Sequence, residues 1–316
     1  MRGPPPELSW RSLGEPALSA VTKLAQACLS ADGGQPFADD PGFLRARYLG
    51  GAETDADWAG RRLVCVSSLR RAPAGLPPAG SPPDGDVAAP VTSGMVHPAW
   101  RRRGIGEHAF DWAAARAAGG RLRAETEALN EGAHALYVSR GLAQLFAEDV
   151  MQLAGQTPLP AAHSPRDLIL SEWGQADPAR FYAVYHEAFR ERPGFPGWPQ
   201  ERWIEWISHD DDFRPEWTLL ATLDGADVGF IAGEASGWIA QVGVVPRARR
   251  KDIGARLIAE VVDRMRSAGE TSITLNVNVN NPGAAALYGR LGFRRIGRRA
   301  RYHTPPDAWP RLAARS

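Results

Sequence analysis

The sequence has few of the residues that would stabilise it by disulfides or hold a metal. It has two cysteines, Cys28 and Cys65, which lie far apart, each in an apolar segment. We therefore expect two buried free thiols, as is usual in a reducing compartment. The seven histidines are scattered, and none has a partner at the spacing of a metal-binding pair. No metal site is predicted.

Long hydrophobic runs and a charge excess are also missing. No apolar run approaches the roughly 18 residues that a membrane-spanning helix needs. The first ten residues, MRGPPPELSW, lack the apolar core of a secretion signal. The formal net charge of +1 argues against a general nucleic-acid binder. These absences argue against a membrane-spanning, a secreted and a general nucleic-acid-binding protein. A cytoplasmic protein is therefore predicted, and we expect a monomer or a homodimer.

The 316 residues contain one pattern twice. In each half an apolar strand ends in Val-x-Pro, and a basic loop and an amphipathic helix follow. A second strand then leads to Asn, and Ala-x-x-Leu-Tyr comes next. The first copy of the loop reads MVHPAWRRRGIGEHAF and the second reads GVVPRARRKDIGARLI. The repeat predicts two similar domains, residues 1–155 and 156–316, joined near segment 154–167.

The order of the predicted elements indicates the fold class. Helical segments open each half, at residues 15–31 and 177–191, with Asp177 as the N-cap of the second. Antiparallel strands follow, with a hairpin turn at Asp224-Gly225, and then strand–helix–strand–helix–strand. This order is typical of an α/β fold with a mixed sheet in each half. The proline-rich segment 71–90 is predicted to be a long connection between strands.

The basic loop before each amphipathic helix has the features of an anion site. Backbone N–H groups at a helix N-terminus attract anions, and glycine lets a phosphate approach the backbone. Arginine adds charge and paired donors. The first loop contains Arg101, Arg102, Arg103, Gly104, Ile105 and Gly106. The second contains Arg249, Arg250, Lys251, Asp252, Ile253, Gly254 and Ala255.

A second segment accompanies each loop. It reads NEGAHALYVSRGL from Asn130 and NPGAAALYGRLGF from Asn281. Tyr137 and Tyr288 each follow the asparagine by about two helical turns. Such a tyrosine either packs in the core or points into a cleft, where its phenol can give a proton to a leaving group.

Together these segments resemble those of the GNAT family of acyl-CoA-dependent N-acyltransferases. In that family the R-x-x-G-x-G/A loop binds the pyrophosphate of coenzyme A, and the Asn…Leu-Tyr segment supplies a general acid. The resemblance implies two tandem GNAT domains, acetyl-CoA as cofactor and N-acetyl transfer as the reaction. It places two strand ends beside the pantetheine arm: Gly94, Met95 and Val96 in the first half, and Val242, Gly243 and Val244 in the second.

The resemblance also implies an acceptor, namely a primary amine of a natural product, an amino sugar or a cysteinyl sugar. Such an amine must be neutral to attack a thioester, and the thiolate that departs needs an acid. We predict Tyr288 as the acid, Glu234 as the base, and Trp198 and Trp238 as pocket residues. Trp238 stands where some tandem members of the family carry a glutamate base. A role in the core or on the surface is the alternative for each tryptophan and for Glu234.

Further candidate residues leave it undecided which half of the sequence is catalytic. Glu125, Glu127 and His97 are possible cleft residues of the first half. Asp252 takes the position of Gly104, where it would either repel the pyrophosphate or cap its helix. Family analogy favours the second half for catalysis, whereas the intact loop favours the first for binding coenzyme A. The alternative function is a non-catalytic acyl-CoA-binding or interaction protein built from degenerate GNAT domains.

The arginine-rich segment 293–304 alternates apolar residues with arginine. This alternation is typical of a charged edge strand, where the charges discourage pairing with another sheet. The alternative is that Arg298, Arg299 and Arg301 attract an acidic acceptor or a phosphate of coenzyme A.

Overall fold

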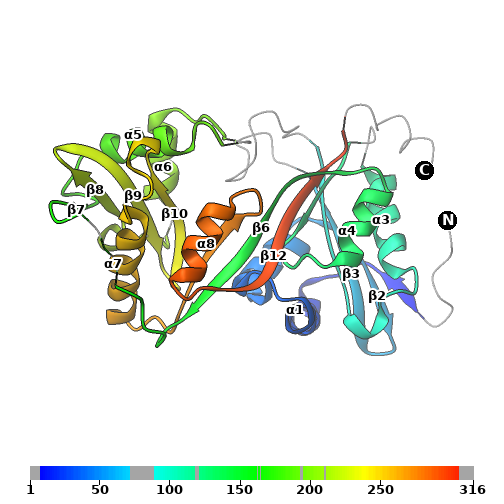
Figure 1. Cartoon of the computed structure of the whole chain (residues 1–316). Coiled ribbons are helices and arrows are strands. Elements are labelled where there is room, and N and C mark those ends of the chain that lie inside the picture. The colour runs from blue at the N-terminus through cyan, green and yellow to red at the C-terminus, as the bar shows by residue number, and fades with distance from the viewer. Residues whose placement is uncertain are drawn as a thin grey trace. The chain divides into compact units, whose positions relative to one another are not determined.

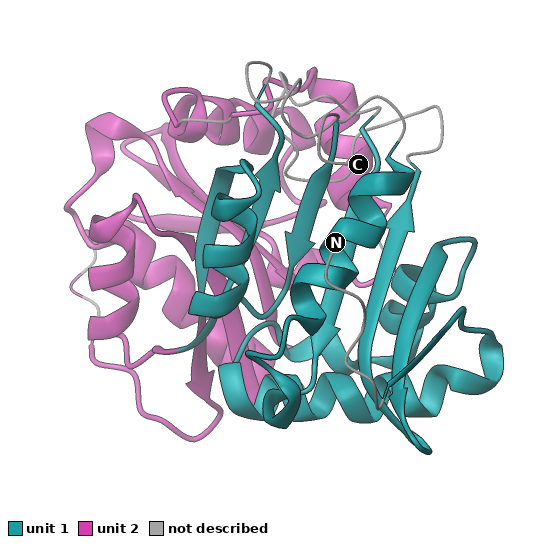
Figure 2. Ribbon diagram, turned by 90° about the vertical axis from the view of Figure 1, so that its right-hand side faces the viewer, with its two compact units in different colours: residues 1–77, 86–150, 296–316 teal, residues 78–85, 151–295 magenta. Residues whose placement is uncertain are grey.

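The computed structural model describes residues 8–71, 89–117, 121–161, 163, 165–192, 195–209 and 211–305. The described residues form two compact units (Figure 2). Unit 1 contains those up to Val150 together with residues 296–305, and unit 2 contains Met151–Arg295. The division predicted after residue 155 stays a prediction. Most of the predicted proline-rich connection, residues 72–88, lies outside the described residues.

Unit 1 is built on a mixed sheet, as predicted (Figure 1). Its strands are β1 (Ser9–Arg11), β2 (Glu53–Ala59), β3 (Arg62–Arg70), β4 (Val91–Val96), β5 (Arg123–Thr126), residues 296–303 of β12 (Arg294–His303) and residues 143–150 of β6 (Ala143–Ala154). They follow the order β1-β2-β3-β4-β5-β12-β6. β4 and β5 are parallel, whereas β12 runs antiparallel to β5.

β12 is an internal strand, so the prediction of an edge strand was wrong. It lies between β5 and β6, and its arginines form ion pairs with carboxylates on both neighbouring strands. Arg299 pairs with Glu148 of β6, and Arg301 pairs with Glu127 just after β5. The start of this segment also approaches another part of unit 1 closely, because a Cβ on Gly33 or Gly297 would overlap the backbone of the other segment.

Four α-helices cover the sheet of unit 1. They are α1 (Leu18–Asp32), α2 (Pro41–Tyr48), α3 (Ile105–Arg116) and α4 (Glu131–Ser139). Short 3-10 turns, η1 (Glu15–Ala17), η2 (Pro36–Asp39) and η3 (Pro98–Trp100), precede α1, α2 and α3. Asp40 caps α2 and Asn130 caps α4, each accepting a hydrogen bond of 2.9 Å from a backbone N–H of the first turn. Apolar residues of α1 and α2, such as Leu24 and Leu44, form a core with β3.

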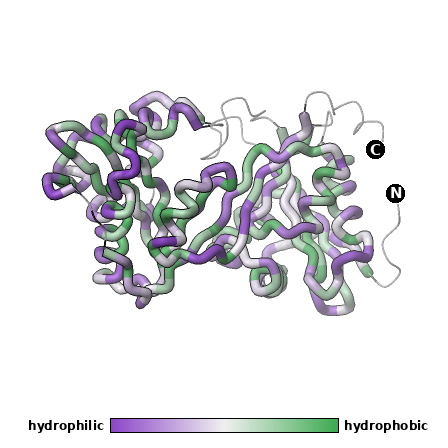
Figure 3. The backbone as a smooth tube through the Cα atoms, in the orientation of Figure 1, coloured by the Kyte–Doolittle hydropathy of each residue, from purple (hydrophilic) through white to green (hydrophobic). Residues whose placement is uncertain are grey.

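Unit 2 repeats this plan. Its strands are β7 (Ile169–Glu172), β8 (Leu219–Leu223), β9 (Ala226–Glu234), β10 (Trp238–Val244), β11 (Ser272–Asn278) and residues 151–154 of β6, in the order β6-β11-β10-β9-β8-β7. Its helices are α5 (Pro178–Phe189), α6 (Gln200–Ser208), α7 (Ile253–Ser267) and α8 (Pro282–Arg290), with 3-10 turns η4 (Pro215–Trp217) and η5 (Pro246–Ala248). Along α7, buried residues recur at helical spacing, and Figure 3 shows the matching alternation of hydropathy.

Two local predictions in unit 2 are confirmed. Asp177 caps α5 and accepts a hydrogen bond of 2.9 Å from the Ala179 N–H. Asp224 and Gly225 join β8 to β9 with φ angles of 52° and 75°, the left-handed pair that a two-residue hairpin turn requires. Both features depend only on neighbouring residues, which is why the sequence predicts them.

Candidate active site

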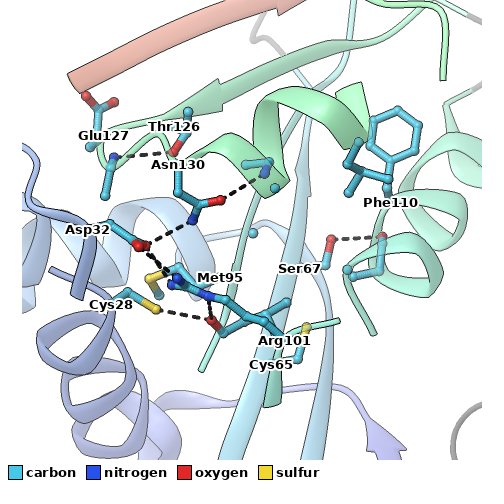
Figure 4. Close-up of a pocket in the computed structure, with 18 of the residues that line it drawn as sticks. Cys28, Asp32, Cys65, Ser67, Met95, Arg101, Phe110, Thr126, Glu127 and Asn130 are labelled. Carbon is cyan, nitrogen blue, oxygen red and sulfur yellow. Dashed lines mark hydrogen bonds and ion pairs between the residues drawn. The ribbon is translucent and has the colours of Figure 1, made fainter. Parts of the chain in front are cut away.

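A cavity of about 690 Å³ lies within unit 1, where β4 and β5 diverge. The two strands pair only at Val91 and Thr92, which lie opposite Arg123 and Ala124. Beyond Thr92 the strands separate, and the edge of β4 that faces β5 is left unpaired. The cavity is bounded by the end of β4, the loop before α3, β5, the start of α4, and the inner faces of α1 and α2 (Figure 4).

The loop before α3 forms one end of this cavity. Arg102 and Gly104 have φ angles of 64° and 80°, and a Cβ on Gly104 would meet no atom within 4 Å. The first N–H groups of α3 have no acceptor within the helix, and left-handed residues just before them create a concave row of backbone donors. Gly104 and Gly106 both line the cavity. This end therefore fits a diphosphate.

The side chain of Arg101 is fastened inside unit 1. Its Nη1 and Nη2 donate to the two carboxylate oxygens of Asp32 at 2.7 and 2.6 Å, and its Nε donates to the Val96 carbonyl at 3.1 Å. Asn130 joins the same group, because its Nδ2 donates to Asp32 at 3.0 Å. That the Arg101 side chain contacts a pyrophosphate stays a prediction. Arg101 and Arg102 line the cavity together with Gly104 and Gly106, but the Arg101 guanidinium is already paired with Asp32.

The corresponding loop of unit 2 has the same backbone. Arg249 donates from Nε to the Val244 carbonyl at 3.2 Å and from Nη2 to the Ala188 carbonyl at 3.1 Å. Asp252 has a φ of 55°, near the 80° of Gly104, which a short polar side chain tolerates better than most. Asp252 turns outward and occupies the N-cap position of α7, as one of the two hypotheses has it, but its exposed side chain accepts no hydrogen bond from the helix.

Both predicted tyrosines are buried. Tyr137 lines the cavity of unit 1, with its ring centre 4.8 Å from that of Tyr302 and 6.0 Å from that of Phe110. Burial raises the pKa of Tyr137 to about 12, and burial raises the pKa of Tyr288 to about 12 as well. Each phenol therefore remains protonated at neutral pH and can donate a proton.

Two carboxylates line the inner wall of the cavity, as their alternation along the sequence predicts. Glu127 accepts from Arg301 at 2.6 Å and from Arg47 at 3.1 Å, and Glu125 accepts from Arg70 at 3.1 Å. Burial alone would raise the pKa of Glu127, but the guanidinium groups of Arg301, Arg47 and Arg299 lower it to about 2. The same kind of pairing lowers the pKa of Glu125. Both are fixed negative charges and unsuited to act as bases at neutral pH.

The third candidate of the first half lies in the loop. The Nδ1 atom of His97 accepts a hydrogen bond of 3.1 Å from the Ala99 N–H, and Arg62 contacts the other ring nitrogen. Burial and the charge of Arg62 lower the pKa of His97. His97 thus shapes the loop, and it is not one of the residues that line the cavity.

The helices α1 and α2 supply cavity residues that the sequence analysis did not single out. Cys28 and Asp32 are one turn apart on α1, and Arg47 and Tyr48 end α2. Burial raises the pKa of Cys28 to about 11, so this thiol is protonated at neutral pH. Their helical spacing gives the only local signal, and it does not tell a cavity-facing side chain from a core one.

The predicted catalytic and pocket residues of unit 2 are spread over its structure. Glu234 ends β9 and lies opposite Trp238, the first residue of β10. This register places Glu234 roughly 13 Å along the strand from Val242. Trp198 is 7% exposed, and its ring centre lies 5.4 Å from that of Trp206 in the core of unit 2.

The strands of unit 2 also diverge beside the predicted pantetheine residues. β10 and β11 pair at Trp238 and Ile239 and then separate. Gly243 lies on the side of β10 that aromatic residues cover, because a Cβ there would come within 3.0 Å of Phe189 and of Phe230. Asn281 caps α8 through a hydrogen bond of 3.1 Å from the Ala284 N–H, as Asn130 caps α4 in unit 1.

Each unit has two parallel strands that diverge, a basic loop before a helix, and a second helix capped by asparagine. These features match the family that the sequence resembles. The sequence profile described as "Acetyltransferase (GNAT) family" matches residues 86–142 and 179–293. The chain belongs to this family. It is a GNAT acetyltransferase with two tandem segments, and its cofactor is acetyl-CoA. The alternative of a non-catalytic binding protein is not favoured. No helix in the described ranges has the length and apolarity to cross a membrane.

Named relatives support the same assignment. The mycothiol acetyltransferase of Clavibacter michiganensis subsp. michiganensis is 28% identical over 92% of this chain and 94% of its own. That of Thermomonospora curvata is 28% identical over 93% and 96%. A GCN5-related N-acetyltransferase from Sphaerobacter thermophilus superimposes with a TM-score of 0.70 at 24% identity, over 95% of this chain and 96% of its own. A tandem GNAT protein from the clavulanic acid biosynthesis pathway superimposes with a TM-score of 0.57 at 18% identity, over 95% and 99%.

The cavity of unit 1 fits acetyl-CoA. The open backbone at Gly104 and the first turn of α3 would hold the diphosphate. The edge of β4 from Gly94 to Val96 borders the cavity, and Arg101 already donates to its Val96 carbonyl. Its other backbone groups would pair with the amides of the pantetheine arm.

Proposed function

We propose that this acetyltransferase acts on the primary amine of a small molecule, with acetyl-CoA bound in the cavity of unit 1. The observation that carries this proposal is that one cavity connects the open loop at Gly104 with Tyr137. These residues belong to the two segments that the family pattern pairs. When bound there, acetyl-CoA supplies the acetyl group as a thioester.

The residues around the cavity divide the work. The edge of β4 and the start of α3 hold the cofactor, and Tyr137 is the proposed proton donor because its pKa of about 12 keeps it protonated. The wall formed by α1 and α2 is the proposed acceptor side, with Arg47 and Glu125 as fixed charges for a polar molecule. Because arginines lower the pKa of Glu125 and Glu127, these carboxylates are poor bases, and the amine is proposed to bind in its neutral form. The amine attacks the thioester carbon and the C–S bond breaks. The departing thiolate takes the Tyr137 proton, and the proton that the amine nitrogen loses restores the phenol.

The names of the relatives indicate which acceptor to test first. The relatives are named mycothiol acetyltransferases, and from the acceptors that the resemblance implies we propose the amine of a cysteinyl sugar. Natural-product amines and amino sugars are the other candidates. The hypothesis that Tyr288 and Glu234 carry the chemistry in unit 2 stays a prediction, supported by family analogy.

A panel of amines tests the proposal. The purified protein is mixed with acetyl-CoA and with a cysteinyl glycoside, glucosamine, an aliphatic diamine or no amine, and the release of free coenzyme A is followed. We expect release that depends on the cysteinyl glycoside, with the N-acetyl product confirmed by mass spectrometry. Release that is the same with and without amines would show thioester hydrolysis and contradict the proposal. Release with glucosamine or with the diamine, but not with the cysteinyl glycoside, would show that the acceptor is an amino sugar or an aliphatic amine instead.

A further inference from the structure

Asp32 lines the unit 1 cavity and joins three elements there. It is the last residue of α1, and its carboxylate accepts hydrogen bonds from both Nη atoms of Arg101 and from Nδ2 of Asn130 (Figure 4). Arg101 in turn holds the end of β4 through the Val96 carbonyl. The Cys28 thiol donates to the same carbonyl at 3.5 Å. One carboxylate thus fastens the loop before α3 and the first turn of α4 to α1.

The contacts are buried enough to be rigid. The Asp32 side chain is 9% exposed and that of Arg101 is 26% exposed. A paired, two-pronged contact between guanidinium and carboxylate fixes direction as well as distance. Asn130 is itself fixed, because its Oδ1 accepts from the Ala133 N–H at 2.9 Å. The loop and the start of α4 both line the cavity.

Unit 2 shows what this junction adds. Arg249 has the same contact with the end of its strand, but its other donor goes to a backbone carbonyl, that of Ala188. No carboxylate pairs with Arg249 in the described part of unit 2, and Asn281 there caps its own helix. The contact of the arginine with the carbonyl at the end of its strand is thus common to both units, whereas the carboxylate that links loop to helix is a feature of unit 1.

We propose that Asp32 is a positioning residue for acetyl-CoA. It holds the phosphate loop and the start of α4 at the separation that the cofactor requires. This inference rests on the proposed cofactor site in unit 1.

Electrostatics alone predicts the opposite effect, which makes the sign of the result decisive. Coenzyme A is an anion, so replacing Asp32 with a neutral residue removes a repulsive charge and frees the Arg101 guanidinium. By Coulomb's law this change would tighten binding. Weaker binding after the substitution therefore reports a loss of positioning.

The experiment measures the affinity of acetyl-CoA for the full-length chain by calorimetry, at low and at high salt. For Asp32→Asn we expect binding about 10-fold weaker than for the wild type at both salt concentrations, since misplaced groups cost roughly this much or more. We expect KM for acetyl-CoA to rise with it and kcat to change less. Asp111→Asn is the matched control, because Asp111 pairs with Arg140 in unit 1 away from the cavity. It should bind within about twofold of the wild type.

A second variant guards against misfolding. Asn130→Ser keeps a good helix cap but is too short to reach Asp32, so binding should weaken in the same direction, by about threefold. Thermal unfolding of each variant checks that it is folded. Unchanged or tighter binding of acetyl-CoA by folded Asp32→Asn would overturn the proposal. A wild-type protein that does not bind acetyl-CoA in unit 1 would instead contradict the proposed function.

Discussion

The two units share one backbone plan but differ in the chemistry of the strand that borders the cleft. In both, the two central parallel strands pair briefly and then diverge, and a left-handed loop opens the next helix. Relative to the capping asparagines, the strand positions correspond one by one. Unit 1 has Arg123, Glu125 and Glu127 at these positions, where unit 2 has Thr274, Asn276 and Asn278.

The charged version needs partners from elsewhere in the chain. A buried carboxylate is costly unless it is paired. The pair for Glu127 comes from Arg47 in α2 and from Arg301 in β12, near the end of the sequence. The motifs of unit 1 therefore lie in the first half, but its site is completed by a strand from the second. The corresponding residues of unit 2 are neutral and need no arginine to balance a buried charge.

The strands before the loops differ as well. β10 has an irregular register with β9 between Ile239 and Gln241, whereas β4 pairs regularly with β3 along its whole length. Irregularities of this kind often re-aim side chains beside active sites. Of the two strands before the loops, β10 of unit 2 is the irregular one, and in unit 1 a cavity connects the loop with the tyrosine. The following experiments separate these contributions.

The largest expected effect concerns stability in acid. The pKa of Glu127 in the folded protein is about 2, below its ordinary value of 4.5. Stabilisation from this group is therefore present above about pH 4.5 and is lost as the pH falls toward 2, by an amount on the order of 3 kcal/mol. Urea unfolding at several pH values measures it. We expect Glu127→Gln to be less stable at pH 7 and to change less with acid.

Glu131→Gln is the control for that measurement. Glu131 is exposed at the first turn of α4, so its replacement should leave the pH dependence of unfolding as in the wild type. If Glu127→Gln and the wild type lose stability in parallel, the buried charges of unit 1 are not what distinguishes it from unit 2.

The second effect concerns the two tyrosines. A positioned proton donor contributes about 100-fold or more to turnover. We therefore expect Tyr137→Phe to lower kcat by about 100-fold and Tyr288→Phe to lower it by less than about threefold. Steady-state release of coenzyme A at saturating acceptor compares the two. The reverse ranking would place the chemistry in unit 2, as the sequence hypothesis for Tyr288 has it.

The smallest effect concerns Asp252. Asp252 has a left-handed backbone conformation and its side chain makes no capping hydrogen bond to α7. Asp252→Gly should therefore relieve strain and raise stability by about 1 kcal/mol or less. Acetyl-CoA binding should change by less than about twofold if unit 1 holds the cofactor. Thermal unfolding and calorimetry measure the two effects. Binding that tightens about tenfold would instead identify the loop of unit 2 as the main site.

The sequence predicts the local parts of this molecule well. The repeated loops, the helix cap at Asp177 and the hairpin at Asp224 follow from neighbouring residues, and the structure contains all of them. The mixed sheet in each half follows from the order of the elements, which the family resemblance supports.

Non-local features could not be predicted in the same way. The place of β12 in the sheet depends on pairing between residues that are far apart in the sequence. Its arginines resemble those of an edge strand in the sequence alone, because the carboxylates that pair with them lie on other strands. Asp32 and Arg47 look like ordinary polar residues at the ends of helices. Only the folded arrangement turns them toward the cavity and gives Asp32 its two partners.

One substitution tests most directly whether acetyl-CoA binds in the cavity of unit 1. Gly104→Asp gives unit 1 the residue that unit 2 already tolerates at this left-handed position, and a Cβ there meets no neighbour. Gly104→Asn adds nearly the same volume without the charge. A carboxylate about 4 Å from a phosphate costs about 1 kcal/mol per charge even in water. We predict that acetyl-CoA binds about tenfold more weakly to Gly104→Asp than to Gly104→Asn at low salt, with the difference reduced at high salt. Equal affinity of the two variants would contradict the account.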